Sequence, residues 1–192
     1  LALQRYGRGV LAAQELNDLA LVGELRGSAE LDGEGLIRAA AATDRLDLRE
    51  PQRAISIEGL RGGLDWRRDG HGEIRPLSFA HARLGDIAVD ALRSRWQIRD
   101  RAAHLIGPLS ARLLGGKLVA QDLTLREPAA DVTWLQGRVG VRGMGHDATD
   151  GSFGIANLAA DLDLRLAGAL DALHIAADAS LHGGQALAGS IY

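Results

Sequence analysis

The closest match to a known chemical motif is Gly143-Met144-Gly145-His146-Asp147-Ala148, which fits the pattern Gly-x-Gly-x-x-Ala. In dinucleotide-binding proteins this loop leads from a strand into a helix, whose N-terminus faces the pyrophosphate. Here the next residues are Asp150-Gly151-Ser152-Phe153-Gly154, which would end a helix at once. Because the chain contains 25 glycines, a chance match is expected. We therefore predict no bound cofactor.

The six histidines do not form a metal-binding pattern. Only His174 and His182 share a face of one expected strand, and roughly 26 Å of extended chain would separate them. One metal ion cannot bridge that distance. The chain has no cysteine and no His-Glu-x-x-His or nucleophile-elbow motif. We expect solvated histidines, no metal site and no enzymatic activity; the other four are His71, His81, His104 and His146.

Carboxylates gather near the C-terminal end of the chain, at Asp161, Asp163 and Asp171, with Arg165 among them. As catalytic acids they would need a cleft and a partner that shifts their pKa. A solvated outer face of a strand explains them with nothing further. The three tryptophans, each at the end of an apolar run, are expected as single anchors in the core or at its rim, with a shared binding platform as the alternative; they are Trp66, Trp96 and Trp134.

The segment from Leu158 to Ala172 shows which element carries these side chains, because it alternates with a period of two. Leucines occupy even positions and charged residues odd positions. Successive side chains of a strand point to opposite faces, whereas a helix would need apolar spacings of three and four. We predict strands with one aliphatic and one charged face, whose apolar residues are Leu158, Leu162, Leu164, Leu166 and Leu170, followed by Leu173, Ile175 and Leu181 in a partner strand.

A similar alternation begins at Leu19, where odd positions are apolar or glycine as far as Gly33. Fully extended, this run would cover about 50 Å, so we expect a turn near Gly27-Ser28. Its apolar-face candidates are Leu19, Leu21, Leu25 and Leu31. Residues 1–18 fit a short helix or an irregular entry segment, and the Ala-rich residues 36–42 are also compatible with a helix.

Glycine-rich positions mark the breaks between the expected strands. The apolar residues occupy odd positions before Gly59 and even positions after it, a change that is typical of a β-bulge. Residues 67–72 contain Asp-Gly and predict a hairpin turn, and residues 143–154 are the longest loop candidate. Shorter breaks are expected at Gly85-Asp86, Arg99-Asp100 and Gly115-Gly116.

Composition limits the class of protein. The net charge of −3 gives no electrostatic case for nucleic acid or an anionic membrane surface as a partner, and no apolar run is long enough for a membrane-spanning helix. Aromatic residues make up 4% of the chain, so a closed core built from Leu and Ala would be thin. The start at Leu1, without a basic-then-apolar leader, leads us to expect a fragment of a larger protein.

One internal sequence similarity suggests a repeating unit of several strands. Leu46-Asp47-Leu48-Arg49-Glu50-Pro51 recurs as Leu123-Thr124-Leu125-Arg126-Glu127-Pro128, which gives a weak repeat near residues 46–66 and 123–143. Such repeats occur in solenoid-like arrays. We therefore treat residues 1–192 as one all-β segment.

Two stretches resemble the AsmA-like superfamily of bacterial envelope proteins, in particular its YdbH-like branch, with TamB and AsmA as relatives. They are Ile57-Glu58-Gly59-Leu60-Arg61-Gly62-Gly63-Leu64-Asp65-Trp66, and Leu113-Leu114-Gly115-Gly116-Lys117-Leu118 with the Leu123–Pro128 run that follows. Leu114 stands where an aromatic residue is usual. The resemblance covers roughly residues 46–192.

This resemblance implies a long, curved antiparallel sheet that forms an apolar groove. The groove would hold phospholipid acyl chains in the periplasm and carry them between the inner and outer membranes. The parent protein would be anchored in the inner membrane, with an outer-membrane partner and no nucleic acid.

Other functions remain open at the level of the sequence. The chain could be a structural or assembly module of the envelope, which helps outer-membrane proteins to assemble or resembles the N component of type II secretion. An ordinary closed sandwich would also satisfy the alternation. The groove and the scaffold differ in whether lipid occupies the apolar face.

Overall fold

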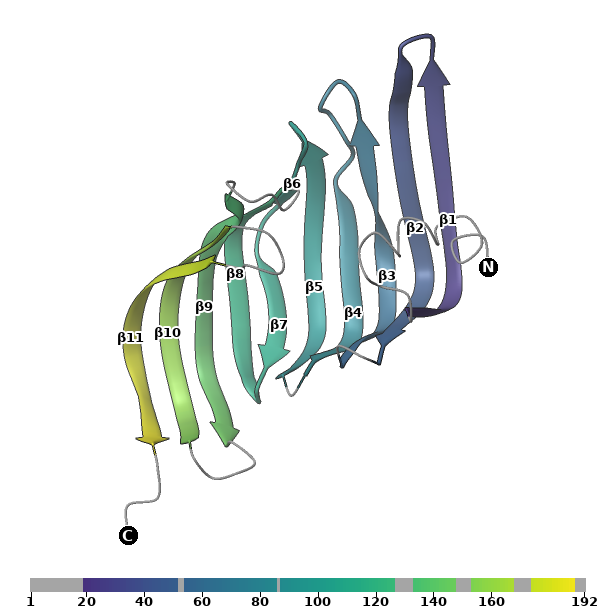
Figure 1. The fold of residues 1–192 in the computed structure, drawn as a ribbon. Coiled ribbons are helices and arrows are strands. Elements are labelled where there is room, and N and C mark those ends of the chain that lie inside the picture. The colour runs from purple at the N-terminus through teal and green to yellow at the C-terminus, as the bar shows by residue number, and fades with distance from the viewer. Residues whose placement is uncertain are drawn as a thin grey trace.

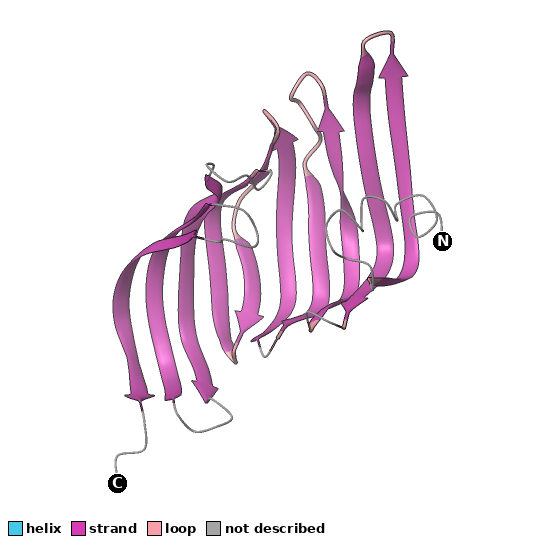
Figure 2. Ribbon diagram, in the orientation of Figure 1, coloured by secondary structure: helices cyan, strands magenta, loops and turns pink. Residues whose placement is uncertain are grey.

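The alternating segments form strands of one antiparallel sheet in the computed structural model, which describes residues 19–51, 54–85, 87–126, 133–147, 153–167 and 174–188. The described part contains eleven strands and no helix (Figures 1 and 2). The prediction of an all-β fold built on a long antiparallel sheet is therefore confirmed. The expected N-terminal helix lies in residues 1–18, outside the described residues.

The strands follow one another across the sheet nearly in chain order. β5 pairs with both β6 and β7, and β8 then pairs with the same two strands. β1 and β11 are the two edges. The strands are β1 (Ala20–Asp32), β2 (Gly35–Glu50), β3 (Ile55–Arg67), β4 (Arg75–Leu84), β5 (Ile87–Arg99), β6 (Ala102–Leu105), β7 (Leu109–Leu113), β8 (Gly116–Leu125), β9 (Thr133–Asp147), β10 (Phe153–Ala167) and β11 (His174–Ala188).

Two local expectations in the N-terminal part are wrong. β1 passes straight through Gly27 and Ser28, because both residues pair in register with Ala41 and Ala40 of β2. Residues 36–42 belong to β2 and form no helix. Alanine favours a helix by only a fraction of a kcal/mol per residue, and pairing with β1 on one side and β3 on the other outweighs that preference.

The expected breaks are mostly in place. β3 ends at Arg67, β4 at Leu84, β5 at Arg99 and β7 at Leu113, as the glycine-containing breaks and the Arg99-Asp100 break predict. The predicted loop 143–154 is wrong in its first part, since β9 continues to Asp147. Gly143, with φ +67°, lies inside that strand.

Irregular residues inside the strands keep apolar side chains on one face. Gly59 has φ +66°, and the pairing of β2 with β3 shifts beside it, so the predicted bulge is confirmed. Ala91 has φ 51° in β5, where the register with β7 shifts. Val89 and Leu92 lie three residues apart and would face opposite sides of a regular strand, yet both pack against the same core cluster. Figure 1 shows that strands β1 to β5 bend near their lower ends.

The core lies at the centre of the sheet, around β5 to β8. Trp96 is buried there, and its Nε1 donates a hydrogen bond of 2.9 Å to Ser94 Oγ. The predicted role of Trp96 as a core anchor is thus confirmed. The other buried members of this cluster, all small or aliphatic, are Leu105, Leu109, Ala111 and Ala120.

A buried carboxylate joins the β3–β4 hairpin to β2. The Asp65 side chain is fully buried; its Oδ1 accepts a hydrogen bond of 2.7 Å from Arg38 Nε, and its Oδ2 accepts bonds from Arg67 Nε and the Glu73 N–H. Burial raises the pKa of Asp65, but these three donors outweigh it and hold the pKa below the ordinary value of 3.8.

Replacing Asp65 with Asn is expected to lower the free energy of unfolding by about 3 kcal/mol near neutral pH, because two arginines lose their buried counter-charge. Since the folded-state pKa of Asp65 is depressed, its contribution is present above 3.8 and is lost as pH falls below that value. Urea titrations should therefore show wild type and D65N converging in acid. The exposed Asp163→Asn variant should stay within about 0.5 kcal/mol of wild type. Parallel pH profiles for wild type and D65N would contradict this role.

Candidate functional site

The leucine-bearing face is the face of the sheet on which Leu158, Leu162, Leu164 and Leu166 of β10 lie. These four leucines are half-buried, whereas Asp161, Asp163 and Arg165 between them are exposed. The alternation predicted for this strand is therefore confirmed for residues 160–166, whereas the pairing register shifts between Leu158 and Ala160.

Cross-strand pairing extends the leucine-bearing face on both sides of β10. Leu162 is opposite Val139 of β9 and Ala179 of β11. Directly opposite residues of an antiparallel pair share a face. One such row runs from β11 to β7 through Leu181, Ala160, Val141, Leu118 and Ala111. A second runs from β1 to β7 through Leu21, Leu48, Ile57, Ala82, Val89 and Leu113.

The predicted face residues fall at the two ends of the sheet. At one end, β1 carries Leu21, Leu25 and Leu31, and Leu19 directly precedes this strand. At the other end, β10 and β11 carry the remaining described members. No pairing brings these two groups together, since eight strands lie between β1 and β10. Leu170 and Leu173 are outside the described residues, and only the backbone of Ile175, opposite Leu166, is described.

Exposure rises toward the edges of the leucine-bearing face. Leu181 on β11 is 72% exposed, and Leu31 on β1 is 71% exposed. At the centre, Leu105 and Leu109 are buried against Trp96. Sequence pattern alone does not mark these two leucines as core residues, because β6 and β7 are short and their packing depends on long-range pairing.

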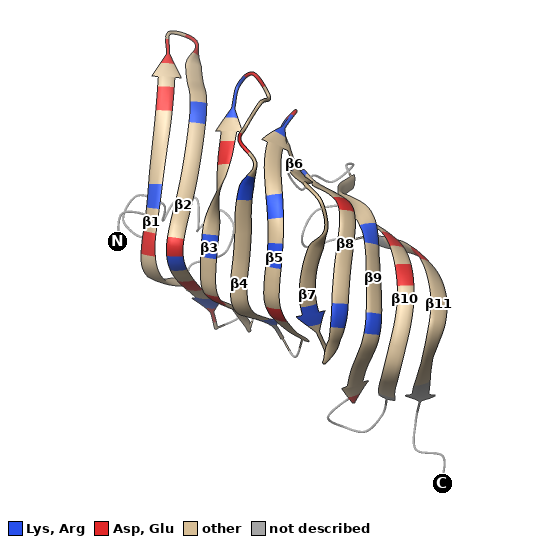
Figure 3. Cartoon of the chain, turned by 180° about the vertical axis from the view of Figure 1, so that it is seen from behind, with Lys and Arg blue, Asp and Glu red and all other residues tan. Residues whose placement is uncertain are grey.

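The opposite face carries the charged residues of β10, and Figure 3 marks the charged positions along all the strands. On it, Arg142 Nη2 donates hydrogen bonds of 2.8 and 3.0 Å to both carboxylate oxygens of Asp161. His182 Nε2 lies 2.7 Å from Asp161 Oδ2 and so links β11 to β10. The Arg142 guanidinium, with a further contribution from His182, holds the pKa of Asp161 below its usual value. Asp161 is therefore the centre of an ion-pair cluster that joins β9, β10 and β11.

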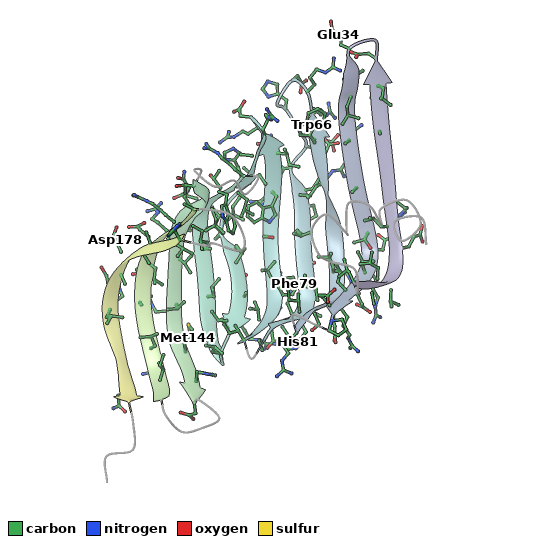
Figure 4. The ribbon with its side chains drawn as sticks, viewed as in Figure 1. Glu34, Trp66, Phe79, His81, Met144 and Asp178 are labelled. Atoms are coloured by element: carbon green, nitrogen blue, oxygen red, sulfur yellow. The ribbon has the colours of Figure 1, made fainter. Side chains whose placement is uncertain are left out.

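This charged face is hollowed over β8 to β11. The hollow measures about 660 Å³, and Asp163 and Asp178, directly opposite each other, both line it. Figure 4 places Asp178 near the upper end of β11. Three cations and three carboxylates line the hollow, namely Lys117, Arg138, Arg142, Asp161, Asp163 and Asp178. The mixture of signs provides no single-charge site there.

The histidines do not combine into a metal centre in the described part of the chain, where no cluster of three or more candidate ligands occurs. His81 Nδ1 is hydrogen-bonded to Asp90 across β4 and β5, near the lower ends of these strands in Figure 4. Burial, assisted by Arg99, lowers the pKa of His104.

The Gly-x-Gly-x-x-Ala match begins within β9, so Gly143 and Gly145 are strand residues and not part of a loop that precedes a helix.

Comparisons with protein-family models, curated proteins and solved structures give no match to this chain. Among the described residues, no helix has the length and apolarity needed to cross a bilayer. Function must therefore be argued from the geometry of the two faces.

Proposed function

We propose that the leucine-bearing face binds the acyl chains of phospholipids and that the protein is a segment of a periplasmic conduit between the inner and outer membranes. The observation that carries this proposal is the pair of in-register aliphatic rows that cross the sheet, one reaching β11 and the other β1. In the described part of the chain, no second sheet or helix covers them. The proposed function is binding and transport, not catalysis.

The chemistry of an acyl chain fits these rows. An acyl chain has no hydrogen-bonding groups, so it needs an aliphatic surface without polar interruptions, and each methylene that it buries contributes about 0.8 kcal/mol. Contiguous exposed apolar patches on soluble proteins usually mark interaction sites. Leu31 and Leu181, the most exposed leucines of this face, would bury the most additional apolar surface under such a ligand.

The inner-membrane anchor, the outer-membrane partner and the periplasmic location belong to the proposal because the AsmA-like resemblance implies them. A lipid route between two membranes also needs a surface that continues from one end to the other. One row has an apolar residue in each strand from β7 to β11, and the other has one in each strand from β1 to β5 and in β7; β6 lies outside both rows.

The direct test is to purify the chain without detergent, extract it with organic solvent and identify the lipids by mass spectrometry. We expect phospholipid to co-purify, and a fluorescent fatty acid to bind and to be displaced by phospholipid. A clean extract together with no binding of the fluorescent probe would refute the proposal.

The free edges of the sheet favour a second candidate, an assembly module of the envelope. Among the residues that the structure describes, β1 and β11 each pair with one strand only, and the described side chains of β11 are all exposed. An unpaired edge can accept a further strand from another chain. If this function holds, a peptide from an outer-membrane strand should protect β11 amides from hydrogen exchange while no lipid is retained.

A further inference from the structure

Four cationic side chains from four strands surround a second hollow on the charged face. They are Arg93 of β5, Arg112 of β7, Lys117 of β8 and Arg142 of β9, and the hollow measures about 570 Å³. Among the described residues that line it there is no Asp or Glu; the others are Ala91, Ser110, Ala111, Gly115, Gly116 and Gly143. The hollow therefore concentrates positive charge in a chain whose net charge is −3.

Strand register places three of these cations side by side. Arg112 is directly opposite Lys117, and Lys117 is directly opposite Arg142. Figure 3 shows the blue positions of β7, β8 and β9 next to one another. Like charges at directly opposite positions repel and destabilise a sheet. An anion bound between them would remove this repulsion.

Among the described residues, a carboxylate is hydrogen-bonded to only one of the four cations. Asp90 is directly opposite Arg112, but it is hydrogen-bonded to His81. Arg142 is held by Asp161 and by the carbonyl oxygens of Val141 and Ala160. No hydrogen bond or ion pair joins the side chain of Arg93, Arg112 or Lys117 to any residue that the structure describes. Their N–H groups are thus available to a ligand.

We propose that this hollow binds a phosphate group, carried either by a lipid headgroup or by a soluble phosphoester. Guanidinium groups match phosphate oxygens with two parallel hydrogen bonds, and an ammonium group adds a point charge. The Ser110 hydroxyl, in register with Arg93, offers one more donor. Gly115, with φ +75°, leaves the rim open because nothing lies within 4 Å of where its Cβ would be.

The remaining negative charge of the protein does not prevent this binding. Charges farther away than about 8 Å are largely screened at physiological ionic strength. The site lies on the face opposite the leucines and is independent of what the leucine-bearing face holds.

The first test is calorimetric titration of inorganic phosphate into the full chain. Replacing Arg112 or Lys117 with Gln should weaken phosphate binding roughly tenfold, since each replacement removes a charge-assisted hydrogen bond. Arg165→Gln removes the same charge from β10, outside the hollow, and should leave affinity unchanged. No binding by wild type, in either this titration or the vesicle assay below, or equal weakening in R165Q, would overturn the proposal.

Stability separates a binding defect from misfolding. Without phosphate, Lys117→Gln should raise the melting temperature, because it relieves repulsion from Arg112 and Arg142. Phosphate should then raise the melting temperature of wild type more than that of K117Q. A lower melting temperature for phosphate-free K117Q would overturn the repulsion on which the proposal depends.

Asp161→Asn provides a test in the opposite direction. It removes the carboxylate that binds Arg142 and should tighten phosphate binding severalfold, a gain that loss of structure cannot produce. Weaker binding by a folded D161N protein would count against the site.

A vesicle flotation assay distinguishes the two sources of phosphate. If the source is a lipid, vesicles of phosphatidylcholine with phosphatidic acid should bind wild type and R165Q equally and K117Q roughly tenfold more weakly, and vesicles of phosphatidylcholine alone should bind wild type less. If the source is a soluble phosphoester, inorganic phosphate should bind while neither vesicle does. Equal loss of vesicle binding in K117Q and R165Q would indicate diffuse attraction and overturn the proposal.

Discussion

Replacing Leu164 with Asp is expected to abolish co-purification of phospholipid and binding of a fluorescent fatty acid. Leu164 lies in the middle of β10, between Leu162 and Leu166. A carboxylate there would place a charge against the acyl chain, and leaving that charge unpaired in an apolar contact costs several kcal/mol. Mass spectrometry of the extracted protein and the probe titration both measure the loss.

The matched control for this experiment is Asp163→Ser, on the charged face of the same strand. Asp163 is exposed and should be replaceable without loss of lipid. Asp161 is a poorer control because it binds both Arg142 and His182. If L164D and D163S retained equal amounts of lipid, the acyl chains would not lie on the leucine-bearing face.

Replacing Trp96 with Ala is expected to lower the free energy of unfolding by about 4 kcal/mol, the largest stability change that we predict. Trp96 is buried, packs in the central cluster and donates a hydrogen bond to Ser94. Small domains have about 5–15 kcal/mol of stability in total, so W96A should be largely unfolded at moderate urea. Circular dichroism during a urea titration measures this change.

Two variants calibrate that result. Trp96→Phe keeps a ring in the cluster and should cost about 1 kcal/mol, mainly through the lost hydrogen bond. Leu164→Asp should destabilise the fold less than W96A, since Leu164 is only half-buried. If L164D were the more damaging change, the stability centre would lie in β10 and not in the cluster around β5 to β8.

The predictions that the structure confirms depend on the order of residues within a single segment. Alternation over residues 160–166 predicts a strand because side-chain direction follows from the backbone of a single segment. The Gly59 bulge is visible as a change of phase from Ile57 to Leu60, and the turn after Arg67 is marked by Asp-Gly. Each of these signals is complete within a few residues.

The predictions that failed depend on a neighbouring strand. Residues 36–42 are compatible with a helix by composition, but they pair with β1 and β3. Gly27 and Ser28 could form a turn, but their register with β2 keeps β1 extended. Gly143 is typical of a loop, yet it adopts a positive φ within β9. Local propensity in each case is smaller than the free energy of pairing and packing.

The sequence by itself determined that the chain forms strands with one aliphatic and one charged side, because that pattern has a period of two within each segment. Only the tertiary structure decided which side chains meet across strands. It placed Arg112, Lys117 and Arg142 side by side, a grouping that neither the net charge nor the sequence positions of these residues indicate. It also buried Leu105 and Leu109 against Trp96. The physical reason is register: a shift of one residue between two strands would exchange their faces, and no single segment specifies that shift.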